Sequence, residues 1–152
     1  IVAKNREYAQ LFTSLFRIRK IHKTYIALTH GIVSKDNKTL KDDLVTIDNG
    51  KKIIQKAVSY LKLLKKSTAF SYVELNPITG RKHQLRKQLY NIGNPIIGDD
   101  KYFINRRADK MKIKSKNLLL HAYKIKFMIN NTQYNFKAEY DQEFEDFLKK
   151  NF

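Results

Sequence analysis

The sequence of 152 residues contains no cysteine, no tryptophan, only two prolines and only five glycines. The absence of cysteine excludes a disulfide scaffold and a thiolate metal site, and it favours a reducing compartment such as the cytoplasm. The four histidines do not have metal-ligand spacing, so we expect no bound metal. The scarcity of proline and glycine leaves no low-complexity linker, which predicts a single domain over residues 1–152.

Two further signals are missing. No apolar run is long enough to cross a bilayer or to form the core of a signal peptide, so we expect no membrane association. The segment "ITGRKHQ", residues 78–84, has neither the repeated glycines nor the Lys-Ser pair of a P-loop. The sequence therefore offers no cradle for the phosphates of a nucleotide cofactor.

What the sequence does contain is positive charge. Lysine and arginine total 31 against 14 acidic residues, giving a net charge of +17, while 42% of the residues are hydrophobic. The hydrophobic content supports a folded domain, and the charge indicates an anionic partner, with nucleic acid favoured over a membrane surface or an acidic protein. The abundance of lysine, asparagine and isoleucine together also indicates a compositional bias that accounts for part of the charge.

The pattern of apolar residues predicts isolated helices between hairpins, which is typical of an α+β fold with a mostly antiparallel sheet. We expect helices over residues 5–19, 81–91 and 141–152, a strand over 23–31, hairpins over 57–77 and 117–138, a charged loop over 34–43 and an irregular basic loop over 96–116.

The predicted helix over residues 81–91 carries unusual charge. Arg81 and Lys82 would lie in its first turn, where the helix dipole favours acids, so they would form an anion site with the free amides there. Arg86 lies beside the apolar stripe of Leu85 and Leu89 and needs a carboxylate, a phosphate or carbonyl groups as partner, because an unpaired buried charge is costly. A solvated basic helix face remains the alternative.

Two other residues draw attention on weaker grounds. The alternation of residues 23–28 places Lys23, Tyr25 and Ala27 on one face of a strand. A lone tyrosine in a strand is more often a core residue with a bonded hydroxyl. We interpret His121, in "LLLHA", as a packed and hydrogen-bonded histidine.

Taken together, these segments resemble a known family. "NPITGRKHQLRKQLYNIGNPIIGDDKYF", residues 76–103, is similar to the signature of the RluA-type pseudouridine synthases, in which a G-R-x-H-Q-[IL]-R helix precedes a G-x-P-[IL]-x-G-D-x-x-Y loop. "HKTYIAL" and "LLLHA" resemble the tyrosine-bearing and late motifs of that family, in the same order.

The resemblance implies an α+β pseudouridine synthase-like catalytic domain that isomerises uridine to pseudouridine in RNA, without cofactor or metal. Large-subunit ribosomal RNA is the favoured substrate, and the residues name no particular uridine. The resemblance makes Tyr25 the active-site tyrosine and Arg86 the partner of a nucleophilic aspartate. It also implies the residues that shape the pocket or contact RNA: Lys23, Gly80, Arg81, His83, Gln84 and Leu120.

The nucleophilic aspartate itself is absent from this sequence. In the family it lies in an H-R-L-D-x-x-T-S-G motif just before a strand similar to "IVAK", with which this sequence opens. We therefore expect residues 1–152 to be the C-terminal portion of a catalytic domain, inactive alone, from a parent protein that is a synthase. Exposed strand edges predict self-association of the fragment.

Two other functions compete with this interpretation. The chain could be a non-catalytic basic RNA-binding module, in which exposed aromatic residues such as Tyr102 and Phe103 stack on bases. It could also be a metal-independent nuclease that uses His83, although general acid–base cleavage needs a second group beside that histidine.

Overall fold

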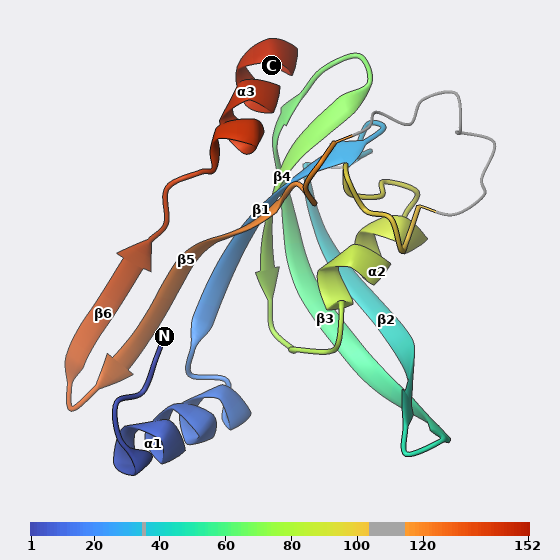
Figure 1. Cartoon of the computed structure of the whole chain (residues 1–152). Helices are drawn as coiled ribbons and strands as arrows, with labels where there is room; N and C mark the ends of the chain where they lie inside the picture. Colours follow the sequence, from blue (N-terminus) through green and yellow to red (C-terminus); the bar gives the residue numbers. More distant parts are fainter. Residues whose placement is uncertain (35, 104–114) are drawn as a thin grey trace.

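A computed structural model of the chain describes residues 1–34, 36–103 and 115–152 (Figure 1). Its strands form one six-stranded sheet in the order β2-β3-β4-β1-β5-β6, and every pairing between neighbours is antiparallel. The elements are α1 Arg6–Arg17, β1 His22–His30, β2 Asn37–Asp48, β3 Lys51–Lys66, β4 Phe70–Pro77, α2 Gln84–Asn91, β5 Leu120–Ile129, β6 Thr132–Lys137 and α3 Gln142–Asn151. The α+β fold with a mostly antiparallel sheet is confirmed.

The helices expected over residues 5–19 and 141–152 are present as α1 and α3, and each begins directly after a capping residue. The side chain of Asn5 accepts a hydrogen bond from the amide of Tyr8 and starts α1, and Asp141 does the same for Phe144 at the start of α3. Among the described residues, no helix is both long and apolar enough to cross a membrane.

The predicted charged loop over residues 34–43 is wrong, because Asn37–Asp48 forms strand β2 and pairs along its whole length with β3. Leu40 and Leu44 are buried on the inner face of this strand. Asn49 and Gly50 both have positive φ and close a tight hairpin, which accounts for a turn that the sequence reading missed. The predicted hairpins after residues 57 and 117 are confirmed, the second turning at Asn130 and Asn131.

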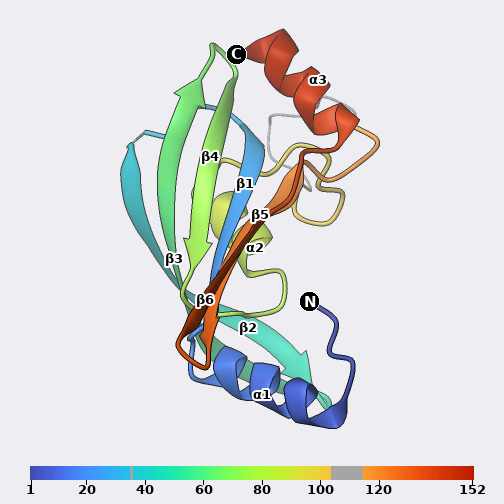
Figure 2. The ribbon, with the colours of Figure 1, turned by 90° about the vertical axis from the view of Figure 1, so that its left-hand side faces the viewer.

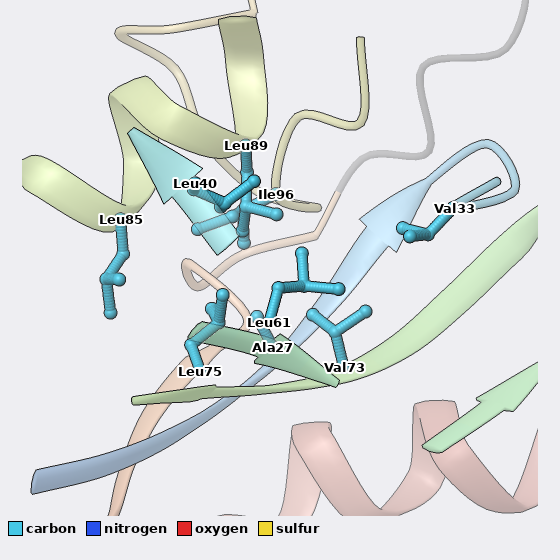
Figure 3. Packing of buried hydrophobic residues seen from close by; sticks show 9 residues of the cluster. All are labelled: Ala27, Val33, Leu40, Leu61, Val73, Leu75, Leu85, Leu89 and Ile96. Carbon is cyan, nitrogen blue, oxygen red and sulfur yellow. The ribbon is translucent and has the colours of Figure 1, made fainter. Parts of the chain in front are cut away.

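One face of the sheet packs against α2. Ala27 of β1 and Leu75 of β4 meet Leu85 and Leu89 of the helix in a cluster of fully buried side chains (Figure 3). These contacts fix the helix across the middle of the sheet. The segment at the start of α2 is thereby placed beside the beginning of β1.

The opposite face packs against α3. The alternate residues of β1, Ile26 and Leu28, point to this side, where Phe144 of α3 is buried with Tyr72 of β4. Figure 2 shows α3 at the end of the sheet away from α1, and α1 lies near the turn of the β5–β6 hairpin. Phe12 of α1 contacts Phe127 edge to face at 5.3 Å.

The segment after α2 adds an irregular arm to the sheet. The amide of Ile97 donates to Leu28 and the amide of Leu119 donates to Ile97, so the arm lies between β1 and the chain entering β5. Gly98 has φ +79, and a Cβ there would lie 1.9 Å from the carbonyl oxygen of Asn117. Only glycine fits this turn, which delivers the next residue, Asp99, beneath α2. Residues 104–114 of the predicted basic loop lie outside the described residues.

Candidate active site

A cavity of about 240 Å³ opens between β1, the start of α2 and the first residue of β5. All eight residues predicted from the sequence line it, together with Pro77, Thr79 and Leu85: Lys23, Tyr25, Gly80, Arg81, His83, Gln84, Arg86 and Leu120. The fold brings together residues that are up to 97 positions apart, counting from Lys23 to Leu120. Their individual roles stay predictions.

The start of α2 differs from the predicted one. The helix begins at Gln84 rather than Arg81, because His83 adopts a left-handed conformation with φ 54 that interrupts the helix. Arg81 and Lys82 therefore belong to a preceding turn, and the amide of Gln84 is bonded to the carbonyl of Arg81. The predicted placement of Arg81 and Lys82 in the first helical turn is wrong, and the basic residues of that turn are Arg86 and Lys87.

The side chain of Gln84 joins the turn at the rim of the cavity to strand β3. Its side-chain oxygen accepts from the Thr79 hydroxyl at 2.7 Å and from the Arg81 amide at 3.0 Å. Its side-chain nitrogen donates to the carbonyl of Val58 and the hydroxyl of Ser59, both on β3. Gln84 is 4% exposed and ties the turn that holds Gly80 and Arg81 to the sheet.

Arg86 has the anionic partner that its position at the edge of the core requires. Its Nε donates to Oδ2 of Asp99 at 2.8 Å and its Nη2 donates to Oδ1 at 2.7 Å, a bidentate pair. The hydrogen bonds to Asp99 raise the pKa of Arg86. Burial alone would raise the pKa of Asp99, but the hydrogen bonds from Arg86 and from the amide of Tyr102 outweigh it, so this pKa is lowered.

A second layer of contacts covers this ion pair. The ring of Tyr102 lies against the guanidinium of Arg86, with 5.0 Å from Cζ to the ring centre. The hydroxyl of Tyr102 is 3.0 Å from Nδ1 of His83. Tyr102 and Phe103 are partly buried, which corrects the expectation that they are exposed stacking residues. Burial, followed by the nearby cations beginning with Arg86, lowers the pKa of His83.

Tyr25 and Lys23 form the wall of the cavity on β1. The alternation predicted for this strand is confirmed, since Tyr25 packs beside the same cluster as Ala27 and Lys23 lines the same cavity. Burial raises the pKa of the Tyr25 hydroxyl and lowers that of the Lys23 ammonium group. At neutral pH the tyrosine is therefore protonated and can act as a proton donor or pack against a neutral ring.

The charge of this cavity is one-sided. Lys23, Arg81 and Arg86 line it, and no aspartate or glutamate is among the described residues of its wall. Within the described residues, no group of three or more histidine, aspartate or glutamate side chains is arranged to hold a metal ion. The cavity suits an anion together with a flat, partly apolar group against Tyr25 and Leu120.

His121 lies outside this cavity, on the α3 side of the sheet. It packs against Tyr140, with 5.7 Å between ring centres, and against Phe144. The expected packing is thus confirmed, but its Nε2 has no hydrogen-bond partner within the described part of the chain.

Comparison with known proteins extends these observations. Residues 1–91 match the family described as RNA pseudouridylate synthase. The chain is 32% identical to the ribosomal large subunit pseudouridine synthase C of Buchnera aphidicola subsp. Baizongia pistaciae over 98% of its length and 51% of that protein. It is 36% identical to the protein of the same name in Rickettsia bellii, covering 82% of this chain and 43% of the relative.

The solved structures show the same fold. Human RNA pseudouridylate synthase domain containing 4 aligns with a TM-score of 0.76 and 24% identity, over 95% of this chain and 67% of that one. Human RNA pseudouridylate synthase domain containing 1 aligns with a TM-score of 0.77 and 22% identity, over 91% and 62%. The chain spans about half the length of the curated relatives described above.

Proposed function

Because the chain belongs to the RNA pseudouridylate synthase family, as its motifs predict, we propose that it contributes to the isomerisation of uridine to pseudouridine in RNA. The substrate class that we propose is ribosomal RNA of the large subunit, which the names of two relatives specify for those proteins. One observation carries the proposal: Tyr25 and Arg86, 61 positions apart, line a single cavity together with the other motif residues.

The reaction is balanced without a cofactor. The bond between N1 of the base and C1′ of the ribose breaks, and a bond between C5 and C1′ forms. C5 loses a proton and N1 gains one, so there is no net change in atoms or electrons. We assign to Tyr25 the packing against the base and a part in this proton transfer, for which its raised pKa keeps the phenol protonated.

We propose that the nucleophilic carboxylate comes from outside the described wall of the cavity. Both oxygens of Asp99 are engaged by Arg86, and the residue is 2% exposed, so it is a poor candidate for attack on a ribose. We propose that an aspartate from outside residues 1–152 enters the cavity and is held by Arg86, and that the 152-residue chain alone is inactive. A cavity lined by cations and no described carboxylate is consistent with this arrangement.

The net charge of +17 supports RNA as the partner, and a two-stranded ribbon of mixed charge lies beside the cavity. β3 pairs with β4 only from Ser59 onward, so its earlier part extends with β2 as a two-stranded ribbon (Figure 1). Lys51, Lys52 and Lys56 are exposed on this ribbon. The Nε of Arg81 donates to the carbonyl of Lys56 at 3.2 Å, which joins the ribbon to the rim of the cavity.

The test measures release of tritium from C5 of labelled uridine in a large-subunit ribosomal RNA transcript. We expect the protein expressed from the complete gene to release tritium, and we expect the 152-residue chain to release none. In the complete protein, Tyr25→Phe should abolish release and leave RNA affinity within about threefold, because the ring is retained and only the hydroxyl is lost. Tyr8→Phe, which removes an exposed hydroxyl on α1, is the matched control and should be silent.

The outcomes separate the candidate functions. Tritium release by the 152-residue chain would contradict the proposal that the nucleophilic aspartate lies outside residues 1–152. RNA binding without release by the complete protein would instead support a non-catalytic RNA-binding module, and cleavage of the RNA strand would support a nuclease.

A further inference from the structure

The carboxylate of Asp99 is held by four hydrogen bonds next to the cavity, although the family resemblance assigns it no role. Besides the two bonds from Arg86, its Oδ1 accepts from the backbone amides of Lys101 at 3.0 Å and Tyr102 at 2.9 Å. Its side chain is completely buried, whereas that of Arg86 is 20% exposed. The carboxylate is therefore held in place by backbone amides of its own segment, independently of its bond to Arg86.

This geometry decides which part of the guanidinium is left for a second anion. A guanidinium has five N–H donors, and Asp99 takes the edge made by Nε and one N–H of Nη2. The N–H groups of Nη1 and the outer N–H of Nη2 have no hydrogen-bond partner in the described part of the chain. Since Arg86 lines the cavity, this free edge is available to a group that enters it.

Tyr102 restricts Arg86 from a second direction. Its ring lies against the guanidinium plane at 5.0 Å, and its hydroxyl is anchored to Nδ1 of His83 at 3.0 Å. The planar group is thus held along one edge and against one face. An arginine held in this way loses little freedom when it binds a further anion.

We propose that Asp99 is a positioning residue for the isomerisation: it holds Arg86 by Nε and Nη2 and so presents the opposite edge of the guanidinium to the reacting carboxylate. This inference rests on the proposed function. The carboxylate of Asp99 touches neither substrate nor reacting atoms and acts only through Arg86. Gly98 serves the same end, because its turn places Asp99 beneath α2.

The predicted consequence is a loss of rate rather than of RNA binding. In Asp99→Asn one side-chain oxygen becomes an NH₂ group that cannot accept from Nε of Arg86, so the bidentate hold is lost and the guanidinium keeps a single hydrogen bond. Misplacing a catalytic group by about 1 Å costs roughly 100-fold in rate. We expect kcat for tritium release by the complete protein to fall about 100-fold, with KM for the RNA changed less than about threefold.

The neighbouring residue supplies the control. Asp100→Asn makes the same change of charge in the same segment at an exposed side chain that does not bond Arg86, so its kcat should stay within about twofold of the unmodified protein. If Asp99→Asn does not fold, Asp99→Glu keeps the charge but shifts the carboxylate by one methylene. We expect it to lower kcat about tenfold at unchanged KM.

A second measurement does not depend on activity. In the 152-residue chain labelled with ¹⁵N, the Nε–H proton of Arg86, assigned with Arg86→Lys, should exchange slowly with solvent, and Asp99→Asn should make this exchange at least tenfold faster. Asp100→Asn should leave it unchanged.

The two arms distinguish this proposal from the one on which it rests. An active protein in which Asp99→Asn keeps the full kcat, or loses only RNA affinity, overturns the positioning role alone. Tritium release that is absent from the unmodified protein overturns the proposed function, and the positioning role falls with it. Rapid exchange of the Arg86 Nε–H proton in the unmodified chain contradicts the hold by Asp99 in either case.

Discussion

Replacement of Gln84 by leucine is the sharpest test of how the pocket is built. The side-chain amide of Gln84 takes part in four hydrogen bonds, with Thr79, Arg81, Val58 and Ser59, at 2.7 to 3.1 Å. Each contributes about 1 kcal/mol net, and their loss leaves buried donors and acceptors unpaired, whereas leucine recovers part of the sum by apolar burial. We expect the free energy of unfolding to fall by about 3 kcal/mol.

The assay is urea unfolding of the 152-residue chain, followed by circular dichroism at constant m-value. Gln10→Leu on the exposed side of α1 is the matched control and should change the free energy of unfolding by less than about 0.5 kcal/mol. Thr79→Val removes one of the four bonds, and combined with Gln84→Leu it should cost less than the sum of the two single changes, because the partners are shared. A loss below about 1 kcal/mol for Gln84→Leu would refute the reasoning that this amide anchors the turn.

Three further outcomes are expected. Gly98→Ala should destabilise the chain by at least about 3 kcal/mol in urea unfolding, since the added Cβ meets the Asn117 carbonyl at 1.9 Å on a positive-φ backbone; an alanine at the exposed turn glycine Gly50, which has nothing within 4 Å, should cost less. The pKa of Asp99 is lower in the folded chain than in the unfolded one, where it is 3.8. The stabilisation by the Asp99 carboxylate is therefore present above pH 3.8 and is lost as the pH falls through the folded pKa. The difference in the free energy of unfolding between the unmodified chain and Asp99→Asn should shrink between about pH 5 and pH 2. The exposed outer strand β6, with Phe136 55% exposed, should let the 152-residue chain self-associate, and a monomeric mass by light scattering at high concentration would count against this.

The elements predicted well from the sequence are those whose signals are local. Asn5 and Asp141 cap their helices directly, and the Asn130–Asn131 turn needs only its own two residues to adopt positive φ. None of these features depends on a distant partner, so composition and spacing suffice to find them.

Strand β2 was not predicted because the polar residue on its buried face, Asp42, is explained only by hydrogen bonds from the distant helix α2. Leu40 and Leu44 are buried on its inner face, but Asp42 lies between them on the same face and reads as a loop residue. Its carboxylate accepts from the side-chain amides of Gln88 and Asn91, 46 and 49 residues away on α2. A polar residue on a buried strand face is tolerated when it is hydrogen-bonded, and the bonding helix is not visible in the sequence of the strand.

The candidate site divides in the same way. The position of Arg86 beside an apolar stripe indicates a carboxylate, a phosphate or carbonyl groups as its partner, and the structure contains a carboxylate. The identity of that partner depends on the path of the segment after α2, which Gly98 and its close approach to Asn117 determine. The family resemblance pairs Arg86 with an aspartate outside the chain and assigns no role to Asp99.

The contrast between α2 and α3 favours a binding site over a solvated surface at the basic cluster. α3 has Glu143 and Glu145 in its first turn and lysines in its last, the arrangement that its dipole favours. α2 has no acid in its first turn, and burial, followed by the cations Arg86, Lys101, Lys82 and Lys87, lowers the pKa of His83 beside it. A cluster of like charges costs stability, and the ion pair with Asp99 offsets the repulsion that Arg86 contributes. Such a departure from the dipole preference, which both α1 and α3 follow, is expected where an anion is to be bound.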